Sequence, residues 1–255
     1  MFNFFVAKEN LQNNCYRIDG GDYNHIKNVL RMSVGDTFLV SCEGQSDLCR
    51  ILDFEDNAVI AEVIEQNVNN TELPLKLYLF QGLPKGDKME FIIEKAVELG
   101  AYAVVPTEMA HCVVKLDDKK KISKVERWQK LSMSAAKQSK RNIIPEICEC
   151  MSFKKALEFA KTLDLLLVPY ESANGMAATK EALSKIKSGM SVGIMIGPEG
   201  GFADNEIEAA KNIGGEIISL GSRILRTETA AVTALSMCML YSETENKNEK
   251  FTRSV

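Results

Sequence analysis

The fold is decided by two loops, Ile196-Gly-Pro-Glu-Gly-Gly201 and Leu220-Gly-Ser-Arg-Ile-Leu-Arg-Thr-Glu-Thr-Ala230, each of which follows an apolar run typical of a buried strand. In the first loop, proline stiffens the turn, while the glycines permit positive φ and let a ligand lie directly on backbone amides and carbonyls. Such backbone recognition suits an adenine ring. The second loop repeats the glycine at Gly221 and adds Arg223, Arg226 and Glu228, which would orient a charged cofactor or a phosphate. Either loop alone is equally compatible with an ordinary strand-to-helix connection.

Strand and helix patterns alternate around these loops. The expected strands cover residues 75–81, 103–107, 144–148, 163–168, 192–196 and 216–220. The expected helices cover residues 87–99, 121–139, 153–161, 178–187, 204–213 and 227–241. This alternation predicts an α/β domain with a parallel sheet covered by helices on both faces. Ligands of such sheets bind beyond the carboxyl ends of the strands, which is where both glycine loops lie.

Two familiar nucleotide-binding motifs are absent from the sequence. The segment Gly82-Leu-Pro-Lys-Gly-Asp-Lys88 has the wrong spacing for a P-loop and no hydroxyl residue after the lysine. No Gly-x-Gly-x-x-Gly follows a strand, and the predicted site lies late in the chain, whereas Rossmann folds place theirs early. These features disfavour an ordinary dinucleotide enzyme and an ordinary Rossmann methyltransferase.

The region before the linker at residues 67–73 has a different pattern. Short β-type runs at residues 3–6, 37–41, 49–54 and 58–65 are separated by turn residues, which predicts a small β-barrel. The segment 25–31 has the pattern of a short helix.

Composition is that of a soluble globular protein, and the N-terminus lacks the basic flank and long apolar region of a signal peptide. We therefore expect a cytoplasmic protein. The seven cysteines include no Cys-x-x-Cys pair, which disfavours a disulfide framework or a zinc ribbon. The two histidines, His25 and His111, make a histidine-rich metal site or a Ser-His-Asp triad improbable, and no metal is expected.

The formal net charge of −4 hides one strongly basic segment. Between Lys115 and Arg141, ten basic side chains face only three acidic ones. Much of this segment is the helix expected at residues 121–139, whose apolar positions recur every three or four residues, so its basic residues would largely fall on the other face. The segment is either a solvated helix face or a surface that binds a polyanion, and its one-sided charge favours the polyanion.

At these residues the chain resembles the bacterial ribosomal RNA small-subunit methyltransferase E family, within the SPOUT superfamily of knotted methyltransferases. The two glycine loops, together with Glu206, resemble the family's two cofactor motifs nearly letter for letter. Matches elsewhere extend the resemblance over almost the whole chain: His25, Val29-Leu30-Arg31, Gly35, Lys85, Glu94-Lys95, Glu98-Leu99-Gly100, Glu126-Arg127-Trp128, Gln138-Ser139, Arg141 and Pro145. The chain departs from the pattern at Asn3, His111 and Lys137.

The resemblance implies a fold and an activity. It implies a PUA-like RNA-binding β-barrel at residues 1–70 and a SPOUT α/β methyltransferase domain with a C-terminal deep trefoil knot at residues 73–243. The polar composition of residues 244–255 predicts a disordered tail. The implied reaction is methylation of N3 of a uridine in 16S ribosomal RNA, with S-adenosyl-L-methionine as the methyl donor. The implied protein is a homodimer whose substrate RNA lies in the small ribosomal subunit.

The resemblance, together with the chemistry of the implied reaction, leads us to expect particular residues in each role. Cofactor contacts are expected from Leu167, Val168, Pro169, Ile196, Gly197, Pro198, Gly200, Gly201, Leu220, Gly221, Ile224, Leu225 and Arg226. Arg226 would stabilise the developing uridine anion, and Glu228 would act as base or orienting group, with Glu199 as the alternative. Glu228 is equally compatible with a structural role, because a carboxylate is favourable at a helix N-terminus. RNA contacts are expected from His25, Arg31, Lys85, Arg127, Gln138 and Arg141.

Two other functions stay open at this point. One is a SPOUT methyltransferase that acts on another RNA, at a transfer RNA base or a ribose 2′-hydroxyl. The other is a non-catalytic RNA-binding or assembly protein that uses the barrel and the basic helix. Cofactor binding separates the second from any methyltransferase, because a binding module does not need intact glycine loops.

Overall fold

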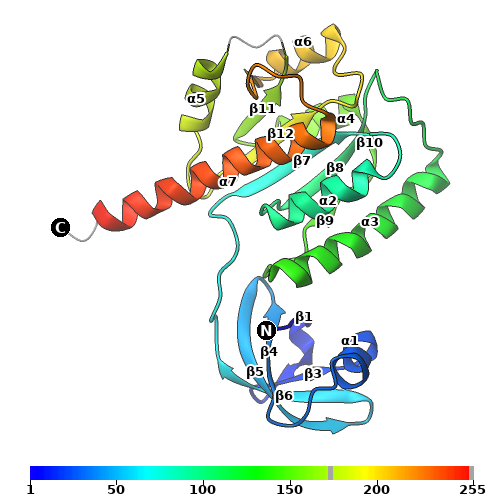
Figure 1. Cartoon of the computed structure of the whole chain (residues 1–255), viewed down its shortest axis with the longest axis vertical. Coiled ribbons are helices and arrows are strands. Elements are labelled where there is room, and N and C mark those ends of the chain that lie inside the picture. Colours follow the sequence, from blue (N-terminus) through cyan, green and yellow to red (C-terminus); the bar gives the residue numbers. More distant parts are fainter. Residues whose placement is uncertain (172–174, 253–255) are drawn as a thin grey trace. The chain divides into compact units, whose positions relative to one another are not determined.

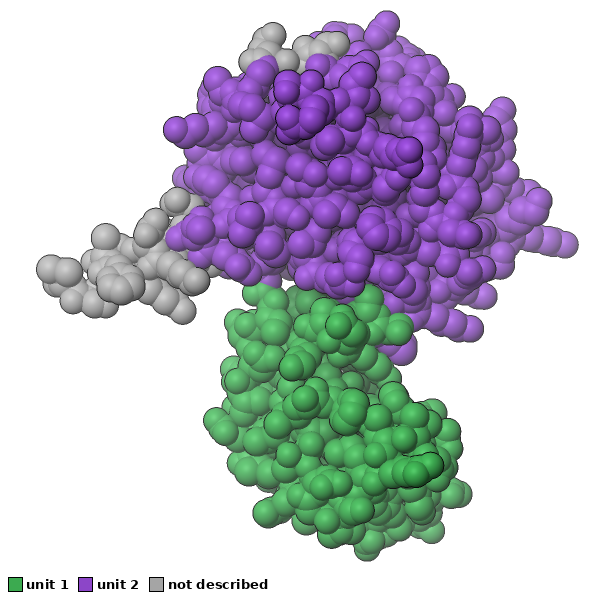
Figure 2. Space-filling model, in the orientation of Figure 1, with its two compact units in different colours: residues 1–72, 134–144 green, residues 73–133, 145–255 purple. Residues whose placement is uncertain are grey.

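The computed structural model describes the backbone of residues 1–171 and 175–252, and the side chains of residues 1–171 and 175–244. The chain forms two compact units, coloured separately in Figure 2. Unit 1 comprises Met1–Glu72 and Ser134–Ile144, and unit 2 comprises Leu73–Met133 and Pro145–Val255. The return segment 134–144 therefore belongs with residues far from it in the sequence. Within the described residues, no helix combines the length and apolar character that crossing a membrane requires.

Unit 1 is built on one six-stranded sheet. Its strands are β1 (Asn3–Phe5), β2 (Leu11–Gln12), β3 (Cys15–Ile18), β4 (Thr37–Cys42), β5 (Gln45–Glu55) and β6 (Ala58–Glu65), in the order β1-β4-β5-β6-β3-β2. Short helical segments are η1 (Lys8–Asn10), α1 (Gly20–Asn24) and η2 (His25–Val29). The core gathers inward-facing side chains of these strands, among them Phe4, Tyr16, Phe38 and Ile51, around Ile26 of η2.

The sequence pattern missed the β2–β3 hairpin. Its turn is Asn13-Asn14, and both residues have positive φ, at 49° and 63°. Asparagine adopts this left-handed conformation more readily than most residues, so the pair closes a tight hairpin without glycine. The two strands are too short to show an alternation of apolar and polar residues, so the Asn-Asn pair is the only local indication of a hairpin in this segment.

The return segment is fixed within unit 1 by Arg141. The guanidinium of Arg141 donates to the carboxylate of Glu72, with Nε at 2.9 Å from Oε1 and Nη2 at 2.5 Å from Oε2. The Arg141 carbonyl oxygen accepts a hydrogen bond from Asn3 Nδ2 at 3.0 Å. Arg141 is only 2% exposed. The guanidinium is thus buried against a carboxylate of the same unit, which favours a structural role, while the expected RNA contact of Arg141 stays a prediction.

Unit 2 contains a fully parallel seven-stranded sheet (Figure 1). The strands are β7 (Lys76–Gly82), β8 (Ala103–Glu108), β9 (Glu146–Ile147), β10 (Met151–Ser152), β11 (Leu165–Pro169), β12 (Ser191–Ile196) and β13 (Glu216–Ile218). Their order is β10-β8-β7-β12-β11-β13, and β9 also pairs with β8. The predicted parallel sheet is confirmed. The central pairing of β7 with β12 brings a late strand beside the first one, so β12 ends in the middle of the sheet.

Helices surround this sheet as the alternating pattern predicted. They are α2 (Lys88–Glu98), α3 (Asp118–Ser139), α4 (Phe153–Ala160), α5 (Met176–Ser184), α6 (Asp204–Asn212) and α7 (Thr227–Thr252). Helix α7 packs against α2 and lies along β7 and β12, while α4 packs against α6 and β8 (Figure 1). The last residues of α3 belong to unit 1.

Helix α7 is longer than the sequence pattern predicted. Its backbone stays helical to Thr252, so the predicted end at Tyr241 is wrong. The segment 242–252 contains no Gly or Pro, and it is rich in Glu and Lys, which are good helix formers even without an apolar face. Of the tail that is predicted to be disordered, residues 253–255 lie outside the described residues.

Gly82, at the end of β7, is required by a close approach of the chain. A Cβ at this position would lie 2.7 Å from both the Cδ and the backbone nitrogen of Pro198, in the glycine loop that follows β12. We expect Gly82→Ala to displace that loop at an overpacking cost of about 1–3 kcal/mol. Ligand binding to the loop should weaken and the melting temperature should fall, as measured by calorimetry. Gly21→Ala, where a Cβ would meet open space, is the control, and equal effects of both variants would contradict the prediction.

Candidate cofactor pocket and its charged end

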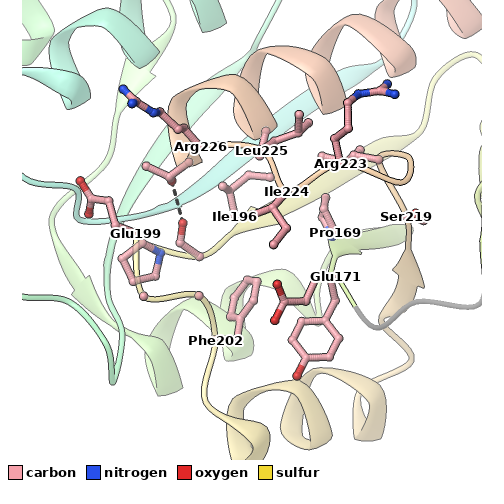
Figure 3. Close-up of a pocket in the computed structure, with 18 of the residues that line it drawn as sticks. Pro169, Glu171, Ile196, Glu199, Phe202, Ser219, Arg223, Ile224, Leu225 and Arg226 are labelled. Atoms are coloured by element: carbon pink, nitrogen blue, oxygen red, sulfur yellow. Dashed lines mark hydrogen bonds between the residues drawn. The ribbon is translucent and has the colours of Figure 1, made fainter.

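A pocket of about 510 Å³ lies beyond the carboxyl ends of β11, β12 and β13 (Figure 3). This volume is typical of small-molecule and cofactor sites. Three loops and the N-terminus of α2 line it: Lys88, Pro169, Tyr170, Glu171, Ile196, Gly197, Pro198, Glu199, Gly200, Gly201, Phe202, Ser219, Leu220, Gly221, Arg223, Ile224, Leu225, Arg226, Thr227 and Ala230. All of these residues belong to unit 2.

The first wall is the glycine loop, residues 197–201, which leaves the central strand β12. A tight turn closes it, with the Gly201 N–H donating to the Pro198 carbonyl oxygen at 2.9 Å and Gly201 at a φ of +69°. A Cβ on Gly200 would lie 2.9 Å from Cβ of His111, whose Nδ1 is 3.0 Å from the Gly200 carbonyl oxygen. Glycine is thus required at Gly201 by the backbone conformation and at Gly200 by close packing.

The second wall is the loop that leads from β13 into α7. Gly221 has a φ of +106°, a conformation that side chains rarely adopt. Beyond it, Ile224 is 87% exposed although it is apolar, and Figure 3 shows its side chain directed into the pocket beside Ile196. The exposed isoleucine and the apolar wall opposite it together offer a surface on which a flat, apolar group of a ligand can pack.

One hydroxyl joins the two walls. Thr227, the first residue of α7, donates from Oγ1 to the Gly197 carbonyl oxygen at 2.7 Å (Figure 3). Oγ1 of Thr227 in turn accepts a hydrogen bond of 2.9 Å from Nε2 of Gln81, a fully buried residue of β7. The hydroxyl of Thr227 therefore holds the beginning of α7, the glycine loop and strand β7 in one fixed arrangement.

We expect Thr227→Val to weaken cofactor binding about tenfold while the protein stays folded. Valine has nearly the same shape but leaves the Gly197 carbonyl oxygen and the Gln81 amide without this partner, a loss of about 1–3 kcal/mol for buried polar groups. Isothermal titration calorimetry measures the dissociation constant. Thr229→Val, an exposed position on the same helix, is the matched control. An unchanged affinity in the Thr227 variant would show that the hydroxyl does not order the walls.

The pocket has a charged end, which Lys88, Glu199 and Arg226 line and behind which lies Glu228. Nζ of Lys88 lies 2.9 Å from Oε1 of Glu199 and 3.5 Å from Oε2 of Glu228. Figure 3 shows Glu199 and Arg226 at the same end of the pocket, with Arg223 and Ser219 at the opposite end. The ion-paired carboxylates and Lys88 therefore lie at the charged end, a further arginine lies at the opposite end, and the apolar contacts lie between the two ends.

The pKa values of Lys88 and Glu199 differ from their usual values because the two side chains are paired. The hydrogen bond to Glu199 raises the pKa of Lys88, with a further contribution from the charge of Glu228, so Lys88 stays cationic at neutral pH. Burial alone would raise the pKa of Glu199, but the hydrogen bonds that it accepts, from Lys88 and from the backbone N–H of Lys85 among others, lower it below its usual value. Glu199 is therefore an ionised loop anchor and a weak base.

The structure gathers most of the predicted site residues in one place. Of the expected cofactor residues, only Leu167 and Val168 do not line the pocket, because both are fully buried inside β11. Among the candidate catalytic residues, Arg226 and Glu199 line the pocket, and Glu228 lies behind them in contact with Lys88.

The expected RNA-contact residues are divided between the two units. His25, Arg31 and Gln138 belong to unit 1, where Arg31 and Gln138 are exposed and the His25 ring lies edge-on to Phe4. Lys85 and Arg127 belong to unit 2 and are exposed, with Arg127 paired to Glu90 at 2.9 Å.

Sequence reasoning missed several residues of the pocket. Lys88 was noted only as part of a failed P-loop motif, although it contacts two carboxylates, and no local pattern signals that contact. Thr227 could have been found, because a threonine at a predicted helix start commonly donates or accepts a capping hydrogen bond. The other missed lining residues are Tyr170, Glu171, Phe202, Ser219 and Ala230. Among the residues that the structure describes, no group of three or more His, Cys, Asp or Glu side chains is arranged to hold a metal ion.

Comparison with known proteins agrees with this site. A family model described as an RNA methyltransferase domain matches residues 71–239, and one described as an RNA methyltransferase PUA domain matches residues 18–64. The chain is 41% identical over 232 residues to Ribosomal RNA small subunit methyltransferase E of Bacillus subtilis, covering 89% of this chain and 91% of that protein. It is 35% identical over 240 residues to the protein of that name from Mesomycoplasma hyopneumoniae, covering 94% and 99%.

A solved structure extends the comparison to three dimensions. The crystal structure of a Ribosomal RNA small subunit methyltransferase E from Neisseria gonorrhoeae, bound to S-adenosyl methionine, matches with a TM-score of 0.77 at 28% identity, covering 92% of this chain and 95% of that one. The parallel sheet, its loop pocket and the matched models define the class as RNA methyltransferases. Within that class, the chain belongs to the ribosomal RNA small subunit methyltransferase E family. The family and the PUA-like first unit that the sequence predicted are thus confirmed.

Proposed function

We propose that this protein transfers a methyl group from S-adenosyl-L-methionine to N3 of a uridine in 16S ribosomal RNA of the small subunit. The observation that carries the proposal is the pocket itself, which combines glycine-loop walls and an apolar middle with a charged end, in a chain of this family. The cofactor follows from the fit of the pocket and from the relative that binds S-adenosyl methionine.

The residues of the pocket fit this cofactor. Ile196, Ile224 and Leu225 offer an apolar surface to an adenine ring, and the Gly197–Gly201 and Leu220–Gly221 backbones offer amides and carbonyls to its edge. The exposed Ile224 would become covered by the bound ring. Arg223, Glu171 and Ser219 supply polar groups at the far end of the pocket.

The target atom sets the chemistry that the protein must supply. When bound, the cofactor supplies an electrophilic methyl group on a positively charged sulfur. The neutral N3–H of a uracil ring is a poor nucleophile, so the site must accept its proton or stabilise negative charge on the flanking carbonyl oxygens. It must also hold the nitrogen in line with the methyl group.

The charged end supports a division of these roles. Arg226, exposed and at the start of α7, stabilises the developing uridine anion. Glu228 is the better proton acceptor of the two carboxylates, because Glu199 already accepts hydrogen bonds from Lys88 and from the Lys85 backbone. The side chain of Glu228 is 18% exposed, and its Oε2 accepts no hydrogen bond among the described residues.

Basic side chains of α3 support the RNA substrate. Lys119 and Lys130 are exposed and make no ion pair among the described residues. Lys121 and Arg127 are paired with Glu108 and Glu90, so they contribute less than the sequence count suggested. Lys137, in unit 1, is likewise paired with Asp22.

The proposal keeps three further expectations from the sequence. A homodimer is supported by the apolar character of α7, where Leu240 remains 57% exposed. A cytoplasmic location follows from a ribosomal substrate. The deep trefoil knot belongs to the proposed SPOUT architecture of unit 2.

The test is methyl transfer from labelled S-adenosylmethionine to small subunits isolated from a strain lacking this protein, followed by nucleoside analysis. Labelled 3-methyluridine is the expected product. Label in another nucleoside would replace the uridine N3 target, and label only in transfer RNA would replace the substrate. Failure of the protein to bind the cofactor would favour a non-catalytic RNA-binding or assembly role.

A further inference from the structure

We propose that Lys88 is a positioning residue of methyl transfer: it holds the carboxylate of Glu199 and leaves that of Glu228 to accept the uridine proton. The inference rests on the proposed function and adds a residue that neither loop motif contains. In the step concerned, the N3–H proton moves to an oxygen of Glu228, the N3 electron pair forms the bond to the methyl carbon, and the electrons of the broken carbon–sulfur bond remain on sulfur.

The position of Lys88 in its helix points to a role outside that helix. Lys88 is the first residue of α2, where a cation is unfavourable because helix N-termini carry partial positive charge. Its ammonium is instead directed to carboxylates from two other elements, Glu199 of the glycine loop and Glu228 in the first turn of α7. One cation therefore joins three elements that meet at the charged end.

The two contacts of Lys88 are unequal. The distance to Glu199 is that of a charge-assisted hydrogen bond, 2.9 Å, whereas the distance to Glu228 is 3.5 Å, too long for a strong one. Glu199 also accepts from the Lys85 backbone at 3.0 Å, so both of its contacts fix the loop. Glu228 thus lies near a cation without being bound tightly by it, and its Oε2 accepts no hydrogen bond among the described residues, so that oxygen is open to a proton.

The surroundings of Glu228 make Lys88 its main electrostatic partner. From α2, Lys88 lies within ion-pair distance of Glu228, and from the glycine loop Glu199 adds a negative charge that is paired with the same lysine. The strands β7 and β12, against which α7 packs, place no charged side chain within ion-pair distance of Glu228 among the described residues. Arg226 precedes it on the same segment. Removing Lys88 would leave two carboxylates facing each other without their shared cation.

Two variants test the proposal in opposite directions, with the pH dependence of kcat as the readout. Without their shared cation, the two carboxylates lose their counter-charge, so Lys88→Met should lower kcat about 10- to 100-fold at neutral pH and move the acidic limb of the profile to higher pH. Glu199→Gln removes a competing carboxylate, frees Lys88 for Glu228 and should move the same limb to lower pH. A residue with only a structural role would not move this limb.

The matched control is Lys95→Met, on the same helix, whose ammonium pairs with the exposed Glu98 and lies over the Phe91 ring. Circular dichroism and the cofactor dissociation constant establish that each variant is folded and binds. If the acidic limb of the pH profile lies at the same pH in Lys88→Met and in Lys95→Met, the proposal is overturned. It is also overturned if Glu199→Gln is inactive, because Glu199 would then be the base. Absence of 3-methyluridine with the unmodified protein would instead refute the proposed function, and the two failures are therefore distinguishable.

Discussion

Arg226→Ala should lower kcat about 100- to 1000-fold while changing the cofactor dissociation constant little. A preorganised cation aimed at charge that develops only in the transition state contributes to turnover and not to ground-state binding, and losing one such group costs about this much. Arg226 is exposed and lies at the charged end, next to Glu199 and away from the apolar middle of the pocket (Figure 3). The measurement combines single-turnover methyl transfer with calorimetric titration of the cofactor.

Arg223→Ala is the matched comparison for Arg226. Both arginines lie on the loop between β13 and α7, but Figure 3 shows Arg223 at the opposite end of the pocket. We expect its loss to affect mainly cofactor affinity and to leave kcat within a few-fold of the original value. A kcat of Arg226→Ala as high as that of Arg223→Ala would remove Arg226 from the mechanism.

Arg141→Met should destabilise unit 1 by about 3 kcal/mol, because breaking a buried ion pair leaves an uncompensated charge. The carboxylate of Glu72 would keep the backbone N–H groups of Asn142 and Ile143 as donors but would lose the guanidinium. Urea unfolding followed by circular dichroism measures the loss. Hydrogen exchange should locate it in residues 1–72 and 134–144.

The neighbouring Lys140→Met provides the control for Arg141. Lys140 is exposed, and it has a positive φ that methionine tolerates no worse than lysine, so its replacement should change stability by less than about 0.5 kcal/mol. If Arg141 contacts RNA instead, the variant would keep its stability but would bind RNA more weakly, and its RNA affinity would depend less steeply on salt concentration. The two outcomes separate the structural role from the expected one.

The sequence was informative wherever the signal is local. The alternation of apolar runs and amphipathic segments predicted every strand from β7 to β13 except β10, a two-residue strand, because each run contains its own period. The glycine loops could be recognised because their backbone conformations require particular residues, such as Gly201 and Gly221. The family followed from these motifs and is confirmed by the relatives.

Contacts between distant segments could not be predicted in this way. Lys88 lies 111 residues from Glu199 in the sequence, and Gln81 lies 146 residues from Thr227. Nothing near Arg141 in the sequence indicates that its partner is Glu72, so the sequence predicts only an RNA contact for this residue, at the end of the basic segment. Charge counts predict which surfaces attract polyanions, but only the fold determines which of those charges are already paired.

The shared hydroxyl of Thr227 also bears on how this pocket could be redesigned. Because one oxygen links the glycine loop to the start of α7, a change of shape in either wall is transmitted to the other. Variants selected to accept an analogue of the methyl donor would therefore need compensating substitutions in both loops at once. A mutational library confined to a single loop would yield mostly variants whose pocket no longer binds a ligand. A library that varies positions of both loops together would yield variants whose pocket has a new shape.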